Sequence, residues 1–440
     1  MATKQYIIFA IVKIGKTTME LKYKLNDRPA TGQLLLYSLQ WFVLAVAVVI
    51  TSMFIATGTP AEKILYTQKA FALVGSAIIV QALWGHRLPI VVGPAAVLLV
   101  GIITALSSQG AEPNTNKIYT SVAIGGAIIT LLSAGKILHR VQRIFTPRIV
   151  VVILMLIAFT LSPTIKNLIF PASEVERHSF ALWATIVGIP AMALAASRLK
   201  GVAKSLLIPI ALIIGCVAYY VYFGGFTEII SAPTHSEGAI LLPKFEFDAS
   251  MILAFLFCYI ALLINDISSI QSLGTMLNTE DTDKRCRRGV GVTGIFNIIA
   301  GAIGIIGPVN YSMSPGVIAS SSCASRYALL PAGAGLIICA IFPKLIAILT
   351  AIPNTIIGIV LLYLMGTQLA AALNMLTAEK SANTFNKALI VGLPIMAALL
   401  FCIVPMGAIP PILKPLMGNG FVMGVITVII LEHLIFRNEK

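Results

Sequence analysis

Fourteen apolar runs of about 17–25 residues divide this chain of 440 residues, and their length constrains its fold more than any other feature. A helix of that length crosses a bilayer core, where a helix satisfies all of its own backbone groups. A hydrophobic content of 58% against 11% charged residues excludes a soluble domain of this size. The sequence therefore predicts an all-α polytopic membrane protein. Its spans are expected to begin near Leu34, Tyr66, Leu88, Lys117, Ile149, Ser179, Lys204, Ala249, Gly289, Val309, Leu330, Asn354, Lys387 and Pro411.

The basic residues are distributed unevenly between the predicted loops. The net charge is +14, and most Lys and Arg fall in the two tails and in alternate loops, whereas the other loops hold mainly Glu. This positive-inside pattern indicates a multi-pass protein of a prokaryotic plasma membrane with both termini in the cytoplasm. It also indicates contact with membrane lipid and no nucleic-acid partner. The six cysteines form no disulfide framework or metal motif, so no metal or cofactor is expected.

An internal repeat is predicted from the position of the longest outer loop. This loop, about residues 224–248, separates the seventh and eighth spans. Because seven is odd, two copies of a seven-span unit have opposite orientations, which predicts a 7+7 inverted repeat. In the third and tenth spans, residues 88–96 and 309–317 each read as a short extended stretch, then Gly or Pro, then a helix. We expect these broken spans to meet near the midplane, with two half-helix N-termini directed at a binding site.

Asp266 is the only acidic residue deep inside an apolar span, within residues 251–269. A charge at the bilayer centre costs roughly 2.5–3.5 kcal/mol on insertion scales, so a carboxylate there normally faces a cavity, a partner or a substrate. Asp266 is therefore predicted to bind substrate and to carry a coupling proton. The alternatives are a buried acid that accepts hydrogen bonds from half-helix N–H groups, or an acid close to the cytoplasmic end of the span.

Polar neighbours of Asp266 extend this candidate site. Asn265 has an amide that both donates and accepts, which suits the lactam edge of a base. It lies about 100° from Asp266 around a helix, so only one of the two is expected to face the substrate. Ser269 comes four residues after Asn265, on the same helical face, and is predicted to pair with it.

The two broken spans and two intact spans supply the remaining substrate-binding candidates. Met313 and Ser314 are expected where the tenth half-helix begins, opposite Gly93, Pro94 and Ala95 of the third span. Met313 would pack against an apolar or aromatic ligand, and Ala95 leaves room for one. Two further candidates lie in the first and twelfth spans: Gln40 and Met365.

Four motifs in consistent order resemble the uracil/xanthine permeases, the nucleobase/ascorbate transporter family. They run from about residue 20 to 375 and lie at the entry to the first span, in the third and tenth spans, and before the twelfth. The motifs are Leu21-Lys-Tyr…Asp27-Arg-Pro…Leu34-Leu-Leu-Tyr-Ser-Leu-Gln40, Gly85-His-Arg-Leu-Pro-Ile-Val-Val-Gly93, Asn310-Tyr-Ser…Gly316-Val-Ile…Ser325-Arg326 and Pro343-Lys-Leu-Ile-Ala-Ile-Leu-Thr-Ala-Ile-Pro353…Gly358. The resemblance implies fourteen spans in a core and a gate domain, a homodimer, and nucleobase transport with protons or sodium.

The resemblance also divides the chain at the predicted span boundaries. The expected parts are a cytoplasmic tail (1–30), core spans 1–4 (31–145), gate spans 5–7 (146–230), an extracellular loop (231–248), core spans 8–11 (249–350) and gate spans 12–14 (351–440).

The chain departs from the family pattern at the site itself. A glutamate is usual in the family's eighth span, and its place corresponds to Asn265 or, with a shift of one residue, to Asp266. The tenth-span Glu or Gln and the Asn that usually follows correspond to Met313 and Ser314, and the His after the first-span Gln corresponds to Trp41. The chain is therefore identified as a divergent member.

Two functions fit this pattern. The first is secondary active transport of a nucleobase (uracil, xanthine or a similar purine or pyrimidine), with a proton, or else sodium, as the coupling ion. The alternative is an anion transporter of the same fold, for sulfate, a dicarboxylate or similar, because helix N-termini favour anions. An enzyme is not expected, since the sequence has no paired carboxylates, nucleophile motif or intramembrane His or Cys cluster.

Overall fold

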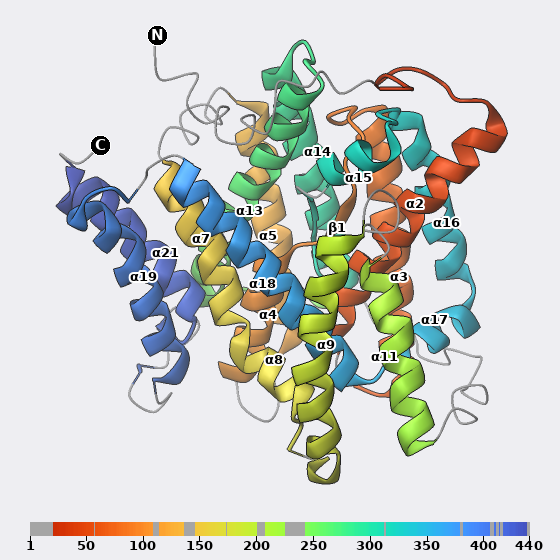
Figure 1. Cartoon of the computed structure of the whole chain (residues 1–440). Coiled ribbons are helices and arrows are strands. Elements are labelled where there is room, and N and C mark those ends of the chain that lie inside the picture. Colours follow the sequence, from red (N-terminus) through yellow and green to blue (C-terminus); the bar gives the residue numbers. More distant parts are fainter. Residues whose placement is uncertain are drawn as a thin grey trace.

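The protein is largely helical (Figure 1). The computed structural model describes residues 21–56, 58–108, 114–135, 146–172, 174–199, 207–224, 243–311, 314–378, 382–404, 409–410, 413 and 417–437. The first half contains α2 (Thr31–Val49), η2 (Ile50–Ile55), α3 (Pro60–Leu83), β1 (Val92–Pro94), α4 (Ala96–Ser108), α5 (Thr115–Ala134), α7 (Pro147–Thr160), α8 (Ser162–Ile169), η3 (Val175–Arg177), α9 (His178–Arg198) and α11 (Leu207–Phe223). The second half contains α13 (Ala249–Met276), α14 (Thr282–Ile303), β2 (Pro308–Asn310), α15 (Ser314–Ser321), η4 (Arg326–Ala328), α16 (Leu329–Ile341), α17 (Pro343–Thr350), α18 (Asn354–Ala378), α19 (Phe385–Ile403), α21 (Gly420–Ile430) and η7 (Leu431–Ile435).

Many of these helices have the length and composition of membrane spans. Each of the fourteen predicted spans overlaps at least one helix. Among the described residues, eight helices are long and apolar enough to cross a membrane, or nine if the pair 326–341 and 343–349, bent by 97°, is one span. The prediction of an all-α polytopic membrane protein is confirmed, while the number of fourteen crossings stays a prediction.

Local sequence fixes where several helices begin. Thr59 and Glu62 form a reciprocal capping box at the start of α3, with Pro60 in the first turn. Asp248 precedes α13, and its Oδ1 accepts the main-chain N–H groups of Ser250 and Met251, both at 3.1 Å. These side chains satisfy N–H groups that the first helical turn leaves without partners.

Two groups of helices are distinguished by their contacts. In the first, α14 packs along α5, α16 packs on α3 and α2, and α13 packs against α4, α5 and α14. In the second, α18 packs against α7, α8, α9 and α11, and α19 packs against α7 and α21. Figure 1 shows α7, α18, α19 and α21 together at one side of the molecule. The chain alternates between the groups, taking residues 31–134 and 249–350 into the first and residues 147–223 and 354–435 into the second.

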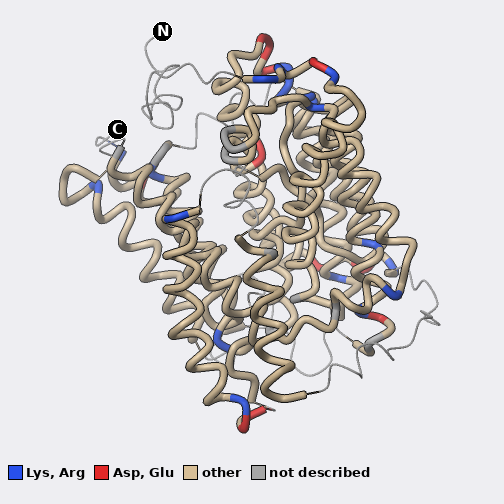
Figure 2. The backbone as a smooth tube through the Cα atoms, turned by 45° about the vertical axis from the view of Figure 1, so that its right-hand side comes forward, with Lys and Arg blue, Asp and Glu red and all other residues tan. Residues whose placement is uncertain are grey.

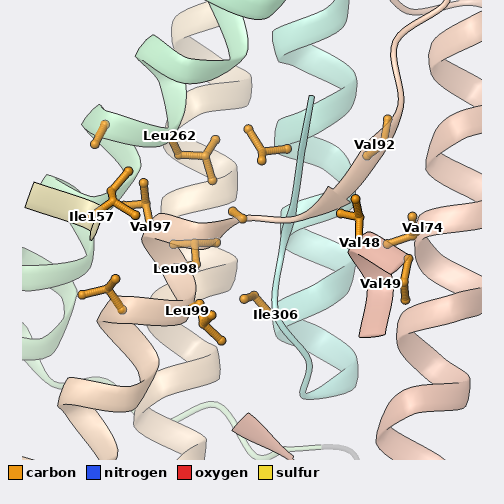
Figure 3. Close-up of a cluster of buried hydrophobic side chains, with 14 of the residues drawn as sticks. Val48, Val49, Val74, Val92, Val97, Leu98, Leu99, Ile157, Leu262 and Ile306 are labelled. Carbon is orange, nitrogen blue, oxygen red and sulfur yellow. The ribbon is translucent and has the colours of Figure 1, made fainter. Parts of the chain in front are cut away.

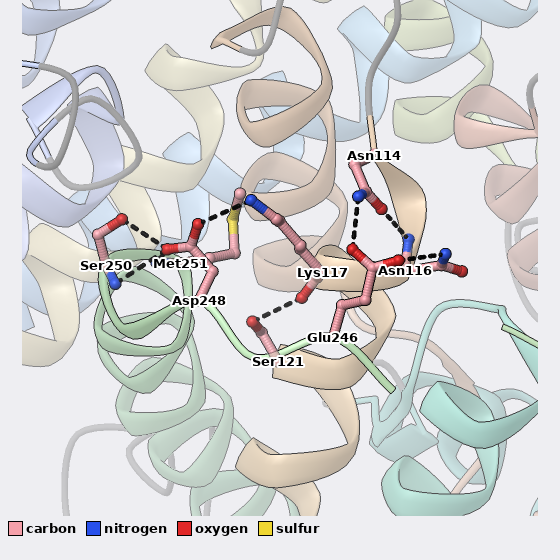
Figure 4. A network of polar contacts seen from close by, with 8 residues as sticks. All are labelled: Asn114, Asn116, Lys117, Ser121, Glu246, Asp248, Ser250 and Met251. Atoms are coloured by element: carbon pink, nitrogen blue, oxygen red, sulfur yellow. Dashed lines mark hydrogen bonds and ion pairs between the residues drawn. The ribbon is translucent and has the colours of Figure 1, made fainter. Parts of the chain in front are cut away.

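Charged residues lie mostly toward the two ends of the molecule (Figure 2). At one end, the segment before α13 is fastened to the start of α5 (Figure 4). Glu246 accepts hydrogen bonds from Asn114 Nδ2 at 2.6 Å and Asn116 Nδ2 at 2.9 Å, and Lys117 forms an ion pair with Asp248 at 3.3 Å. The two amides lower the pKa of the Glu246 carboxyl. This network joins the second half of the chain to the first.

Candidate functional site

Two short strands pair within the first helix group. β1 and β2 are antiparallel, with Val92 opposite Asn310, Gly93 opposite Val309 and Pro94 opposite Pro308. The pairing continues through the N–H groups of Ala95 and Tyr311, which donate to Gly307 O at 3.0 Å and Val91 O at 2.9 Å. Helix α4 begins two residues after the end of β1, and α15 begins four residues after the end of β2. The prediction that the third and tenth spans contain extended stretches that meet is confirmed.

The backbone at this crossing is too closely packed for larger residues. A Cβ atom on Gly93 would lie 2.1 Å from Val48 Cγ1 and 3.1 Å from Tyr311 Cε2, so α2 and β2 can approach β1 only at a glycine. The Tyr311 hydroxyl donates to Pro94 O at 2.6 Å and fastens the end of one strand to the other. Buried Ala95 follows, with 1% of its surface exposed. The predicted third-span residues therefore do line the crossing.

Apolar side chains surround the crossing on several sides (Figure 3). They come from α2, α3, β1, α4, α7, α13 and the chain before β2: Val48, Val49, Val74, Val92, Val97, Leu98, Leu99, Ile157, Leu262 and Ile306. In these surroundings a polar group without a partner costs free energy. Each buried hydrogen bond at the crossing therefore contributes to the stability of the site.

Asp266 lies on α13 against β2 and is fully buried. Its Oδ1 accepts two hydrogen bonds from one residue, from Asn310 N at 3.0 Å and from Asn310 Nδ2 at 2.7 Å. Its Oδ2 is buried and has no hydrogen-bond partner among the described residues. One carboxylate oxygen is thus fixed by the broken tenth span, and the other is buried near Thr293 and makes no hydrogen bond to the described residues.

The sequence did not single out Asn310 or His86 as site residues, yet both belong to this cluster. His86 Nδ1 accepts the main-chain N–H of Leu88 at 2.9 Å, so Nε2 is the protonated nitrogen and donates to Asn310 Oδ1 at 3.1 Å. Both side chains have no exposed surface. The available signal was their presence as polar residues in the third- and tenth-span motifs, Gly85-His-Arg and Asn310-Tyr-Ser.

Gln81 and Thr293 extend the polar cluster toward α3 and α14. Gln81 Nε2 donates to Gly289 O at 2.9 Å and to Thr293 Oγ1 at 3.1 Å. The same Thr293 oxygen lies 3.4 Å from Asn310 Nδ2. The cluster therefore connects α3, β2, α13 and α14, which are all in the first helix group.

Asn265 and Ser269 differ from the expected arrangement. Asn265 is partly exposed, and within the described part of the chain its side chain has no hydrogen-bond partner. Ser269 is buried and donates to the main-chain oxygens of Asn265 at 2.8 Å and Asn310 at 3.0 Å. The predicted pairing of the two side chains is wrong, because the serine hydroxyl bonds to backbone across the turn. Asp266 is the residue that faces β2, and Asn265 keeps its amide available.

The remaining predicted residues have different outcomes. Ser314 is fully buried at the start of α15, where it accepts Val91 N–H at 3.0 Å, so it also joins the two broken spans. Met313 lies outside the described residues. Gln40 is buried on α2, and Met365 is buried on α18 in the second helix group. Substrate contact by Gln40 and Met365 stays a prediction.

Arginines enclose the end of α3 beside this cluster. Arg285 Nη1 donates to the main-chain oxygens of His86 at 3.0 Å and Arg87 at 3.2 Å. Arg326 Nη1 donates to Ala82 O at 3.0 Å. Positive groups are favourable at the carbonyl end of a helix, and here they also hold the connection that carries His86.

The arrangement resembles a transport site more than a reaction centre. Two spans are broken where they meet, and beside them lies a buried acid with one oxygen that none of the described residues hydrogen-bonds. Among the described residues, no group of three or more His, Cys, Asp or Glu side chains could hold a metal ion. Broken helices that meet around a polar site are typical of secondary transporters.

Comparisons with known proteins define the family. The family model described as Permease family matches residues 32–407, and the chain belongs to the uracil/xanthine permease family, whose members are transporters and not enzymes. The chain is 25% identical to the xanthine permease XanP of Escherichia coli over 464 residues, covering 96% of each protein. It is 24% identical to the xanthine permease of Bacillus subtilis, covering 88% of this chain and 89% of that protein.

The fold is also similar to a solved structure. The transmembrane domain of the bicarbonate transporter BicA of a cyanobacterium superposes with a TM-score of 0.57 at 16% identity, covering 93% of this chain and 99% of that domain. BicA has the 7+7 inverted-repeat fold. At this identity the likeness concerns the fold alone.

Proposed function

We propose that this protein is a secondary active transporter that moves a purine-type or pyrimidine-type nucleobase across a bacterial cell membrane by proton symport. The observation that supports this most directly is the buried carboxylate of Asp266 beside the β1–β2 crossing, whose Oδ2 makes no hydrogen bond to the described residues. In apolar surroundings, a carboxylate oxygen without a partner favours protonation or contact with a substrate N–H group. The xanthine permeases among the relatives support a xanthine-like base as substrate.

The proposed substrate site lies at the crossing. We assign it to Gly93, Pro94 and Ala95 of the third span together with Met313 and Ser314 of the tenth, where small residues would contact a flat ring. On α13, the free amide of Asn265 is the proposed contact for a lactam edge, and Asp266 is the proposed proton carrier. Ser269, Gln40 and Met365 remain proposed further contacts.

The proposed transport movement is a displacement of one helix group against the other. Residues 31–145 and 249–350 would form the core with the site, and residues 146–230 and 351–440 the gate. The separate packing of the two groups supports this division. We further propose a homodimer with both termini in the cytoplasm, as the family resemblance and the charge distribution suggest.

Anion transport is less well supported than nucleobase transport. The likeness to BicA concerns only the fold, and the closer sequence relatives are permeases for xanthine. A buried carboxylate next to the site would repel an anion unless it is protonated. Competition by sulfate or a dicarboxylate, but not by xanthine or uracil, would reverse this preference.

The first test is uptake of radiolabelled xanthine and uracil into liposomes that contain the purified protein. We expect an inward proton gradient to drive accumulation, a protonophore to abolish it, and sodium to have no effect. Asp266→Asn should abolish accumulation while xanthine still raises the melting temperature of the protein. A ligand at about 100 times its Kd adds about 2.7 kcal/mol of apparent stability. Uptake driven by sodium alone would contradict the proton assignment, and no uptake of either base would contradict the substrate class.

A further inference from the structure

The buried cluster contains a histidine that does not touch Asp266. His86 lies in the connection between α3 and β1, and Asn310 lies between it and the acid. The hydrogen bonds run in one direction: Leu88 N–H to His86 Nδ1, His86 Nε2–H to Asn310 Oδ1, and Asn310 Nδ2 to Asp266 Oδ1. Every side chain in this series is fully buried.

We infer that His86 is a positioning residue that sets when Asp266 takes up a proton, by fixing the orientation of the Asn310 amide; this rests on the proposed function. An amide side chain has a donor end and an acceptor end, and rotating it by half a turn exchanges them. If Asn310 turned over, its NH2 would face the His86 N–H, and its oxygen would face the Asp266 oxygen. Both contacts would be lost, so His86 keeps the donor end toward the acid.

The side-chain N–H of Asn310 stabilises the two protonation states of Asp266 unequally. Asp266 Oδ1 receives both the main-chain and the side-chain N–H of Asn310. Hydrogen bonds to a carboxylate stabilise its ionised form more than its neutral form, and in the apolar core this opposes the cost of burying the charge. Without His86, the amide loses a contact that favours this orientation over the reversed one. An amide that turns its oxygen toward the acid penalises the ionised form and favours the protonated one.

The other titratable groups near the acid are few. Cys286 of α14 interacts electrostatically with Asp266, and Arg285 of α14 does so with His86. Arg285 also holds the His86 main-chain oxygen at 3.0 Å, so it supports the histidine's position from outside the cluster. His86 itself accepts a main-chain N–H on Nδ1 and donates through Nε2, so both ring nitrogens are used in the neutral form.

The test measures protonation of Asp266 directly and does not depend on transport. In infrared titrations of the protein in lipid, the C=O band of a protonated carboxylic acid is assigned to Asp266 by its absence in Asp266→Asn. We expect His86→Ala to move the midpoint of this band at least about one unit toward higher pH, a tenfold change in the protonation equilibrium. His86→Gln, which can again offer an N–H to Asn310, should return the midpoint most of the way to its wild-type value. His178→Ala, which alters a half-buried histidine of α9, should not move it.

A double variant distinguishes a positioning role of His86 from general damage to the fold. Asn310→Thr keeps the main-chain N–H but removes the amide, so it should shift the midpoint in the same direction. Because His86 acts through Asn310, adding His86→Ala to Asn310→Thr should give no further shift. The inference would be overturned by a wild-type midpoint in His86→Ala or by additive shifts in the double variant. It would also be overturned if neither wild type nor His86→Ala showed an Asp266 band at any pH. If the midpoint shifts in His86→Ala but the wild-type protein transports no nucleobase, the proposed substrate is wrong and the role of His86 stands.

Discussion

At the residue scale, Asn297 joins three elements through one fully buried side chain. Its Nδ2 donates to Thr293 O at 2.7 Å and Pro308 O at 2.9 Å, and its Oδ1 accepts the Tyr259 hydroxyl at 2.8 Å. Asn297→Ala would leave buried partners unsatisfied, and we expect a loss of about 2–3 kcal/mol in stability. Thermal unfolding followed with a thiol-reactive dye measures this, because the cysteines are free and buried or half-buried.

Asn265→Ala is the matched control for this change. Asn265 is partly exposed, and its side chain bonds to none of the described residues, so its removal should change the melting temperature little. If both alanine variants lose the same stability, the contacts of Asn297 do not explain its effect.

The buried acid was predictable from the sequence, whereas its partners were not. Asp266 interrupts an apolar run, and the cost of a charge there alone marks it as a site residue. The choice between Asp266 and Asn265 depends on how α13 is rotated against β2, which a single helix does not determine. His86 and Asn310 are 224 residues apart in sequence, and only the pairing of the two broken spans brings them together.

At the element scale, α5 and α14 approach each other through glycines. A Cβ on Gly301 would lie 2.5 Å from both Ala123 N and Tyr119 O, which are backbone atoms and have little room to move. Gly301→Ala should therefore separate the helices and cost about 1–3 kcal/mol. The measurement is the melting temperature of the purified variant.

Gly392 of α19 provides the control for Gly301, since a Cβ there meets no atom within 4 Å. Gly392→Ala should leave the melting temperature unchanged or raise it slightly, because alanine favours a helix by up to about 1 kcal/mol over glycine. Equal losses in both variants would mean that close packing of α5 on α14 is not the cause.

The segment before α13 should make stability depend on pH through Glu246. Its pKa lies below the usual 4.5 because Asn116 and Asn114 donate to the carboxylate. A carboxyl with a lowered pKa stabilises the folded state above its unfolded pKa and loses that contribution as the pH falls through the folded pKa. The melting-temperature difference between wild type and Glu246→Gln should thus be present at about pH 6 and decline progressively as the pH falls below the usual carboxyl pKa of 4.5.

An exposed glutamate without such partners should behave differently. Glu176 is exposed, and its carboxylate bonds to none of the residues in the described ranges. The difference between wild type and Glu176→Gln is expected to be small at every pH. A difference for Glu246→Gln that persists unchanged at acid pH would show that the gain comes from something other than its charge.

The broken spans were predictable as elements because their sequences conflict with a continuous helix. Proline at positions 89 and 94, and at 308 and 315, interrupts both apolar runs, and the structure has strands at 92–94 and 308–310. Span boundaries were less accurate: α14 begins at Thr282, seven residues before the expected Gly289, because its first two turns are basic and project beyond the apolar run. Hydropathy locates the apolar part of a helix and does not report the polar turns that continue it.

At the scale of the whole molecule, the two helix groups meet along an apolar cleft. It is lined by Ala47 and Thr51 from α2 and η2, by Leu212 of α11, and by Leu361 and Leu364 of α18, and it has room for about one water molecule. Few polar bonds would have to break if these surfaces slid past each other, which suits the proposed movement of core against gate. The cleft is thus the place where a bulky side chain should obstruct transport without touching the β1–β2 crossing.

We expect Ala47→Trp to slow xanthine uptake at least about tenfold, because the indole ring is much larger than the narrow cleft and would obstruct the sliding of α2 against α18. Stabilisation of the protein by xanthine should be unchanged, because Ala47 is not one of the proposed substrate contacts. Leu36→Trp is the control on the same helix, at a position that is 67% exposed, and it should transport normally. Normal uptake by Ala47→Trp, with the protein correctly folded, would show that the two groups do not move against each other at this cleft.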